Sequence, residues 1–309
     1  MADCPPLSFV IPAYNCAETV RESVESIVKG NFERGDELIV VNDGSTDNTA
    51  EVLADIKHQH PFIQIIDNER NIGCPATRNI GIHAASHDLI FNLDSDDALV
   101  RGSRKKLQQY MIVEKADVAA FGESHFCKRA LERVTHKWIY PSGVMSLADY
   151  LSGPIVPGGN YIYTKESWRR VGGYWENGAG LHEFWYFSLK QIANGSKFVV
   201  LPKTYYLHRY AVDSLFAREL VRRDDVSLMA MTMLLHFAEL IDERDLDYVK
   251  ANSTTWFEFD VFSKHPIRVK SGEIGRKGIN VLVSPPTFAV RVVRKVIRTV
   301  NKWLTASRR

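Results

Sequence analysis

The chain has 309 residues, of which 45% are hydrophobic, and its formal net charge at neutral pH is +2. This apolar content is sufficient for one or two domains, and so small a charge gives no reason to expect nucleic acid as a partner. The four scattered cysteines form no CxxC pair, which favours a reduced, cytoplasmic protein. We expect no signal peptide and no transmembrane helix, because no long uncharged apolar run occurs.

Residues 1–125 alternate short apolar runs with amphipathic helical patterns. Strands are predicted over residues 7–11, 37–41, 62–66, 88–93 and 117–121. Helical patterns occur over residues 20–28, 47–58, 71–85 and 104–114, the third opening with a glycine-containing loop. Such alternation predicts an α/β fold, with a mostly parallel sheet flanked by helices.

Three polar clusters directly follow predicted strands, at residues 12–15, 42–47 and 94–97. Ligands of open α/β sheets bind beyond the carboxyl ends of the strands. The three clusters therefore predict a binding crevice at one edge of the sheet.

The cluster Asp94-Ser95-Asp96-Asp97 is the most acidic of the three. Carboxylates at positions i and i+2 of an extended segment share a face, so Asp94 and Asp96 can approach one ligand together. Three adjacent negative charges repel one another unless a cation neutralises them, and oxygen ligands suit Mg²⁺ or Mn²⁺. The alternative is a solvated acidic turn that caps the following helix.

Two further segments carry candidate binding residues. Gly44 can adopt positive φ after the second strand, and we expect Asp43 to be exposed there, where its carboxylate could accept a hydrogen bond from a nucleobase. Gly73 and Pro75 open a helix in which the Arg78 guanidinium could grip a phosphate or orient a carboxylate. The alternatives are an ordinary capped turn and a surface salt bridge.

The second part of the chain is less regular. A helix is predicted over residues 182–194, a strand over 198–201, and a long amphipathic helix from about residue 226. We place one domain at residues 1–215, with a nucleotide-binding half (about 1–125) and an acceptor half (about 126–215). Residues 216–309 are interpreted as a helical C-terminal extension.

Residues 287–309 contain seven basic residues and no acidic one, and their apolar residues recur at helical spacing. A helix of this kind can lie on an anionic membrane surface, with its apolar face down and its basic residues among the headgroups. This predicts a cytoplasmic protein with peripheral attachment at the inner face of the membrane. The alternatives are a helix docked on its own domain or on a second subunit, or a surface that attracts a polyanionic glycan.

Together these segments resemble family 2 glycosyltransferases, which are inverting enzymes of the GT-A fold. The resemblance is carried by Phe9–Asn15, Ile39–Asp47, Asn71–Gly73 with Ala76–Asn79, and Leu93–Asp97, and more weakly by Gly172–Tyr174 and the helix from His182. It covers the first hundred residues in the family's order and fades after about residue 215.

The resemblance implies transfer of a hexosyl or N-acetylhexosaminyl group from a nucleotide sugar, usually a UDP-sugar, to a hydroxyl of a glycan or lipid-linked acceptor. It implies Mn²⁺ or Mg²⁺ as cofactor. In similar enzymes the residue at Asp43 reads the nucleobase, and the aspartates of the DXD motif hold the ribose and the metal. The implied nucleotide-binding residues are Pro12, Ala13, Tyr14, Asn15, Asp43, Arg78, Asp94 and Ser95. The implied metal ligands are Asp96, Asp94 and His208.

The catalytic base is where this chain departs from the family pattern. The base is typically the aspartate of a Glu-Asp pair at a helix start, and here Phe184 occupies that position. Either Glu183 is the base, or His182 serves, or the site is impaired. The competing hypothesis is therefore a catalytically silent homologue that binds sugar nucleotides or acts as a scaffold. A nicotinamide-dependent oxidoreductase is disfavoured, because the first strand lacks a G-x-G-x-x-G turn. The oligomeric state stays open.

Overall fold

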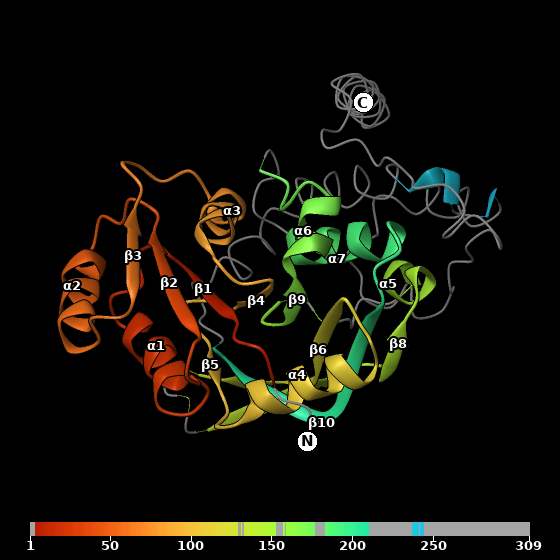
Figure 1. The fold of residues 1–309 in the computed structure, drawn as a ribbon, viewed down its shortest axis with the longest axis horizontal. Helices are drawn as coiled ribbons and strands as arrows, with labels where there is room; N and C mark the ends of the chain where they lie inside the picture. The colour runs from red at the N-terminus through yellow and green to blue at the C-terminus, as the bar shows by residue number, and fades with distance from the viewer. Residues whose placement is uncertain are drawn as a thin grey trace, which may run out of the picture.

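The computed structural model describes residues 4–128, 131, 133–152, 157, 159–176, 183–209, 237–240 and 242–243. These residues form a ten-stranded sheet with helices on both faces (Figure 1). The strand order is β3-β2-β1-β4-β9-β6-β10-β5, with β7 paired to β6 and β8 paired to β10. The predicted α/β architecture with a mostly parallel sheet in its first half is confirmed.

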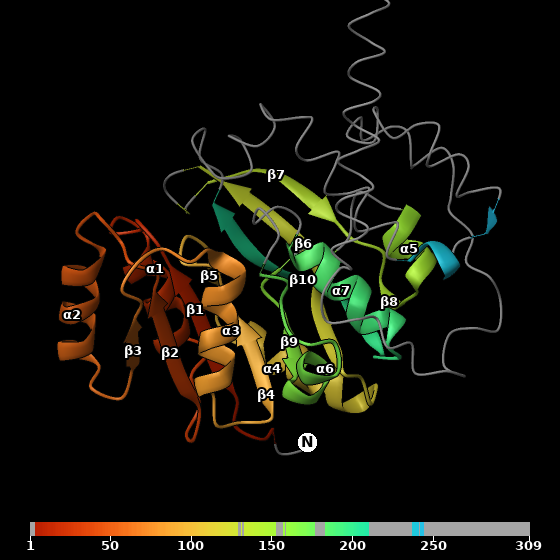
Figure 2. The same cartoon turned by 90° about the horizontal axis from the view of Figure 1, so that it is seen from above.

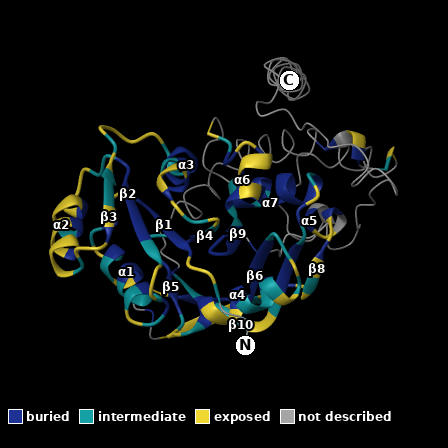
Figure 3. Cartoon of the chain, in the orientation of Figure 1, coloured by how far each residue is buried: buried dark blue, intermediate teal, exposed yellow. Residues whose placement is uncertain are grey.

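The first half contains four parallel strands: β1 (Ser8–Ala13), β2 (Glu37–Asn42), β3 (Gln64–Asp67) and β4 (Leu89–Asn92). The helices between them are α1 (Val20–Val28), α2 (Thr49–Gln59) and α3 (Cys74–Ala84). Both faces of the central strands β1 and β2 are buried (Figure 3), as expected for parallel strands covered by helices.

The second half adds mixed pairing. Its strands are β5 (Ala98–Leu99), β6 (Val118–Cys127), β7 (Val134–Ile139), β8 (Gly143–Met145), β9 (Ile162–Thr164) and β10 (Phe198–Arg209). Its helices are α4 (Ser103–Val113), α5 (Leu147–Ser152), α6 (Lys165–Arg170), α7 (Glu183–Ala193) and a short 3-10 helix (Ala238–Leu240). Strand β9 runs antiparallel between β4 and β6 and joins the two halves into one sheet.

Two hydrophobic clusters cover the two faces of the sheet. One contains apolar residues of α1, α2 and α4, such as Val24, Leu53 and Leu107. The other contains residues of α3 and α5–α7, such as Ile82 and Phe187. Helix α3 packs closely on β1 and β2, as Gly81 shows: a Cβ at this position would collide with the Val10 side chain. This close packing fixes the amino-terminal turns of α3 beside the end of the sheet.

Most strands lie near their predicted ranges, but the last one is longer than predicted. Strand β10 does not stop at Leu201 and continues to Arg209 through an irregularity between Leu201 and Tyr205. Lys203 adopts φ 58° there, and a Cβ on the facing Gly122 would lie 2.6 Å from the Leu201 carbonyl oxygen. His208 therefore lies within a strand, and not after one as predicted.

Several predictions fall on residues outside the described ranges. These are most of the long helix predicted from about residue 226, of which only residues 237–240 are described and form a turn and a short 3-10 helix, together with the basic segment 287–309 and His182. The domain limits at 125 and 215 also remain predictions. Among the helices that the structure describes, none has the length and apolar character needed to cross a bilayer.

Candidate functional site

The acidic cluster lies directly after β4, at the carboxyl end of the parallel strands. Its first backbone amide, at Asp94, donates to Asn160 Oδ1 over 2.8 Å. Asp97 is fully buried, and its carboxylate accepts hydrogen bonds from Asn160 Nδ2 (2.5 Å), His208 Nδ1 (2.9 Å) and the Arg209 amide (2.8 Å). Asp97 thus ties the acidic cluster to β10, a role that the sequence did not indicate.

Asn160 is the residue that sequence reasoning missed most clearly. Its amide contacts both ends of the acidic cluster, and its backbone has φ 53°, directly after Gly159 with φ 149°. Residues in such conformations are uncommon and often lie at functional sites. The Gly-Gly-Asn run at 158–160 was the available sequence signal.

Asp96 differs from its neighbours in the cluster. Asp94 Oδ1 is paired with the Arg78 guanidinium over 2.5 Å. The Asp96 carboxylate, in contrast, accepts a hydrogen bond only from the Asp96 backbone amide within the described ranges. Burial, followed by the negative charges of Asp97 and Asp94, raises the pKa of Asp96 to about 7. A partly exposed carboxylate under this repulsion fits the donor chemistry of a divalent cation.

The rest of a cation site is not built by protein side chains alone. Within the described ranges, no three His, Cys, Asp or Glu side chains form a group that could hold a metal ion. His208 has one ring nitrogen occupied by Asp97, which leaves Nε2 as its remaining contact atom. Although burial lowers the pKa of His208, the Asp97 carboxylate raises it to about 9 overall, and a protonated imidazole does not ligate a metal.

Arg78 connects the acidic cluster to α7. Its side chain is 3% exposed, and its guanidinium pairs with both Asp94 and Glu183. It lies 3.9 Å from the ring centroid of Phe184 and 5.6 Å from that of Tyr174. Of the two predicted roles for Arg78, orienting carboxylates is the one that this geometry shows.

The start of α7 separates Glu183 from Phe184. The Glu183 side chain is 10% exposed and pairs with Arg78 through Oε1, while Oε2 is buried without a hydrogen-bond partner in the described part of the chain. Phe184 is 8% exposed and packs edge-on against Tyr161 and Tyr174 in the core. The helix register therefore turns the glutamate toward the acidic cluster and the phenylalanine into the interior.

Asp43 lies at the carboxyl end of β2, but it is only 2% exposed. Its carboxylate accepts hydrogen bonds from Asn68 Nδ2 (2.9 Å), the Ile72 amide (3.0 Å) and the Gly73 amide (3.0 Å). The predicted exposure of Asp43 was wrong, because loop residues 68–73 fold over the strand end and supply these donors. A carboxylate has about four lone-pair sites, so room for one further donor remains.

The segment 12–15 is only partly the turn that was predicted. Pro12 and Ala13 are buried and belong to β1. Tyr14 is 45% exposed, and Asn15 adopts φ 48° and accepts a 2.8 Å hydrogen bond from the Thr46 amide. The first two polar clusters are thus joined to each other, as the crevice prediction required.

Residues 8–172 match the family model for glycosyl transferase family 2. The chain belongs to this family. An uncharacterized glycosyltransferase from Haemophilus influenzae is 36% identical over 123 residues, which cover 40% of this chain and 37% of the relative. A poly-β-1,6-N-acetyl-D-glucosamine synthase from Staphylococcus epidermidis is 38% identical over 93 residues, which cover 30% of this chain and 22% of the relative. The chain thus spans well under half the length of these relatives.

Solved structures share the fold. TarS 1-349 from S. aureus, in complex with UDP-GlcNAc, superposes with a TM-score of 0.60 at 20% identity, covering 74% of this chain and 65% of TarS 1-349. GalNAc-T7 with UDP, GalNAc and Mn²⁺ has a TM-score of 0.58 at 15% identity, covering 76% of this chain and 48% of GalNAc-T7. The predicted GT-A fold is confirmed by this likeness.

Proposed function

We propose that this family 2 protein is an inverting glycosyltransferase that moves a sugar from a UDP-sugar, with N-acetylhexosamine as the favoured sugar, to a hydroxyl of a glycan or lipid-linked acceptor. The observation that carries the proposal is the polar centre at the carboxyl ends of β1, β2 and β4, where Asp96 has no ion-pair partner among the described residues and lies beside Asp94, which pairs with Arg78 as Glu183 does. Two similar proteins, a poly-β-1,6-N-acetyl-D-glucosamine synthase and TarS in complex with UDP-GlcNAc, support the choice of donor.

The donor would lie across the strand ends. Asp43 would accept a hydrogen bond from the base, Tyr14 and the neighbouring residues 12–15 would line the nucleotide pocket, and Asp94 with Ser95 would contact the ribose. Asp96 would hold Mn²⁺ or Mg²⁺. A bound divalent cation supplies positive charge to the departing diphosphate.

Glu183 is the proposed general base. An inverting transfer needs a group that accepts the acceptor hydroxyl proton as that oxygen attacks the anomeric carbon. Arg78 fixes Glu183 through Oε1, and Oε2, which has no hydrogen-bond partner among the residues that the structure describes, remains to accept the proton. Arg78 thus acts as a positioning residue for the proposed base.

The second candidate function is a silent homologue that binds sugar nucleotides without transferring sugar. Two observations favour it: the Glu183 carboxylate is already paired with Arg78, and the family's aspartate position is a buried phenylalanine. UDP release from UDP-GlcNAc separates the two functions, because only the enzyme releases UDP in step with sugar transfer.

Titration calorimetry of UDP, with and without Mn²⁺, tests the donor site. We expect Asp96→Asn to lose the metal-dependent part of UDP affinity, because the diphosphate charge is then poorly neutralised. Asp88→Asn is the matched control, since Asp88 is an exposed residue just before the opposite end of β4. Failure of the wild type to bind UDP under either condition would refute the proposed function. Equal metal dependence in Asp96→Asn and the wild type would refute the role of Asp96.

The attachment of residues 287–309 to an anionic membrane remains a proposal that rests on the basic, amphipathic sequence pattern alone. Binding of the full chain to anionic vesicles should weaken at high salt, because the attraction between headgroups and basic residues is screened.

A further inference from the structure

Aromatic side chains from β7 and β10 gather around Phe126 of β6. The His136 ring stacks on it at 4.2 Å with an interplanar angle of 12°, Trp138 lies against it at 4.7 Å, and His208 meets it edge-on at 4.7 Å. Phe126 is 5% exposed, whereas His136 is exposed and Trp138 is partly exposed. We call His136 and Trp138 of β7, together with the neighbouring His208 of β10, the β7 aromatic surface.

The strand registers place these rings on one face. His136 is paired with Phe126 across the β6–β7 ladder, and Phe126 is paired with His208 across the β6–β10 ladder. Directly paired residues project from the same face of a sheet. Trp138 follows His136 by two positions and shares its face, whereas Lys137 between them projects from the opposite face.

The β7 aromatic surface begins at the acidic cluster Asp94–Asp97, which we call the acidic centre. His208 donates to Asp97, which directly follows Asp96 in the chain. From there the surface extends along β7, which in the described part of the chain pairs only with β6 and lies beside it at the sheet margin (Figure 2). A ligand lying on β7 therefore reaches the acidic centre by passing over Phe126 of β6, the strand between β7 and β10.

The chemistry of the rings suits a sugar. A pyranose ring presents C–H groups on one face and hydroxyls at its rim, and the polarised C–H groups match the negative face of an aromatic ring. Backbone groups on the edge of β7 that faces away from β6, which pairs with no other strand in the described part of the chain, can meet the rim hydroxyls. We infer that β7 forms an acceptor subsite, in which Trp138 and His136 hold a pyranose ring of a glycan acceptor next to the acidic centre. This inference rests on the proposed function.

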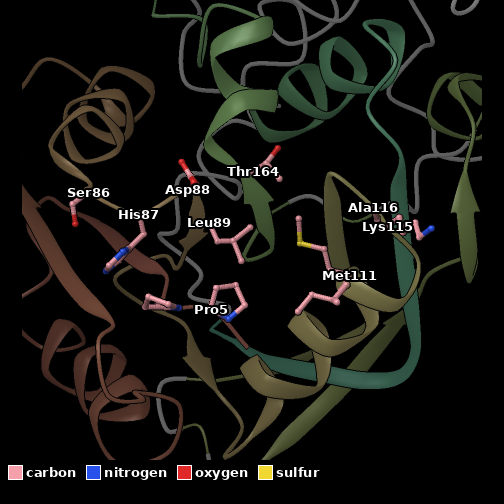
Figure 4. Close-up of a pocket in the computed structure, with 11 residues that line it drawn as sticks. Pro5, Ser86, His87, Asp88, Leu89, Met111, Lys115, Ala116 and Thr164 are labelled. Carbon is pink, nitrogen blue, oxygen red and sulfur yellow. The ribbon is translucent and has the colours of Figure 1, made fainter. Parts of the chain in front are cut away.

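A cavity elsewhere in the molecule fits this role less well. A cavity of about 490 Å³ is lined by residues that include Pro5, His87, Asp88, Met111 and Thr164 (Figure 4). His87 and Asp88 directly precede β4, so the cavity lies at the amino-terminal end of that strand. The acidic centre follows its carboxyl end, so an acceptor in this cavity would be separated from the centre by the length of the strand.

The test measures binding of the full chain to an array of neutral, amino and acidic oligosaccharides of four to eight sugars, in the presence of UDP and Mn²⁺. The wild type should bind at least one pyranose glycan, and Trp138→Ala should bind it about tenfold more weakly, the loss expected for one aromatic contact. Trp138→Phe retains a ring and should retain most of the binding. Lys137→Ala is the matched control and should bind like the wild type.

UDP affinity separates failure of this inference from failure of the proposed function. Trp138→Ala should bind UDP like the wild type, since β7 does not belong to the predicted nucleotide pocket. A wild type that binds UDP but no glycan on the array, or a Trp138→Ala variant that binds the glycan unchanged, would overturn the subsite. A Trp138→Ala variant that only alters the oligomeric state would assign the surface to a second copy of the chain, and would overturn it as well.

Discussion

Arg78 is the residue on which the geometry of the site depends most, and replacing it should have a large effect on stability. The Arg78 side chain is 3% exposed, and its guanidinium is shared by Asp94 and Glu183, whose side chains are 25% and 10% exposed. Arg78→Met keeps much of the side-chain length and the contact with the Phe184 ring, but it leaves two carboxylates without their cation. Removing one partner of a buried ion pair costs about 3–5 kcal/mol. We expect a loss of that size in the free energy of unfolding.

Urea unfolding followed by circular dichroism measures this loss, and a double-mutant cycle isolates its cause. Glu183→Gln should relieve part of the defect of Arg78→Met, because the neutral amide needs no counter-charge. The double variant should therefore be more stable than the sum of the single effects by at least about 1 kcal/mol. Arg101→Met, at an exposed arginine, should change stability by no more than about 0.5 kcal/mol. Additive effects in the cycle, or a loss below about 1 kcal/mol for Arg78→Met, would refute the reasoning.

Two further predictions concern the proposed base and a buried lysine. Glu183→Gln should lower sugar transfer by roughly 10²–10⁴-fold with UDP affinity nearly unchanged; near-normal transfer in a coupled UDP-release assay would redirect attention to His182. Burial lowers the pKa of Lys190 from 10.5 to about 8, while its ammonium donates to the carbonyls of Val171 and Gly173. Between these pH values the unfolded chain binds more protons than the folded one, so the stability of the wild type relative to Lys190→Met should rise by about 3 kcal/mol from pH 8 to 10.5. A pH-independent difference between the two in urea unfolding would contradict this.

The first half of the fold was predictable because local signals agree there. Apolar runs of strand length alternate with helical periodicity, and each polar cluster follows its strand directly. Parallel pairing then brings the strand ends together, so Ala13 lies beside Asn42 in the ladder and Asp43 immediately follows it. The separate sequence segments were therefore sufficient to predict that the candidate site lies at the carboxyl ends of the parallel strands.

The contacts within the site were not predictable in the same way. The Arg78–Glu183 pair joins residues from α3 and α7, and nothing in either segment specifies the other. Asp43 was predicted to be exposed because a strand end was visible in the sequence, whereas the loop amides that bury it were not. The continuation of β10 beyond Leu201 was not predictable, because a proline such as Pro202 usually ends a strand. Here Pro202 and Lys203 instead form an irregularity opposite Gly122.

The identity of the proposed base depends on the residue at position 184, whose side chain packs against the Arg78 guanidinium. The Phe184 ring lies 3.9 Å from the guanidinium, so an aspartate at that position would add a third carboxylate around one positive charge. With phenylalanine, one guanidinium is shared by two carboxylates, so Arg78, Asp94 and Glu183 together carry a net negative charge when both carboxylates are ionised. A carboxylate that is not fully neutralised can still accept a proton, which is the property that a general base requires.

Phe184→Asp therefore separates the two candidate functions. If Glu183 is the base, the variant gains no activity and loses about 3–5 kcal/mol of stability, because a core aromatic is removed and a charge is buried beside existing carboxylates. Phe184→Leu, which keeps an apolar side chain, should lose less stability and retain UDP release from UDP-GlcNAc. If the wild type is instead silent because it lacks the family's aspartate, Phe184→Asp should release UDP in step with sugar transfer while the wild type does not. That gain, if it persists when Glu183→Gln is added to Phe184→Asp, would refute Glu183 as the base, because the new carboxylate then acts without it.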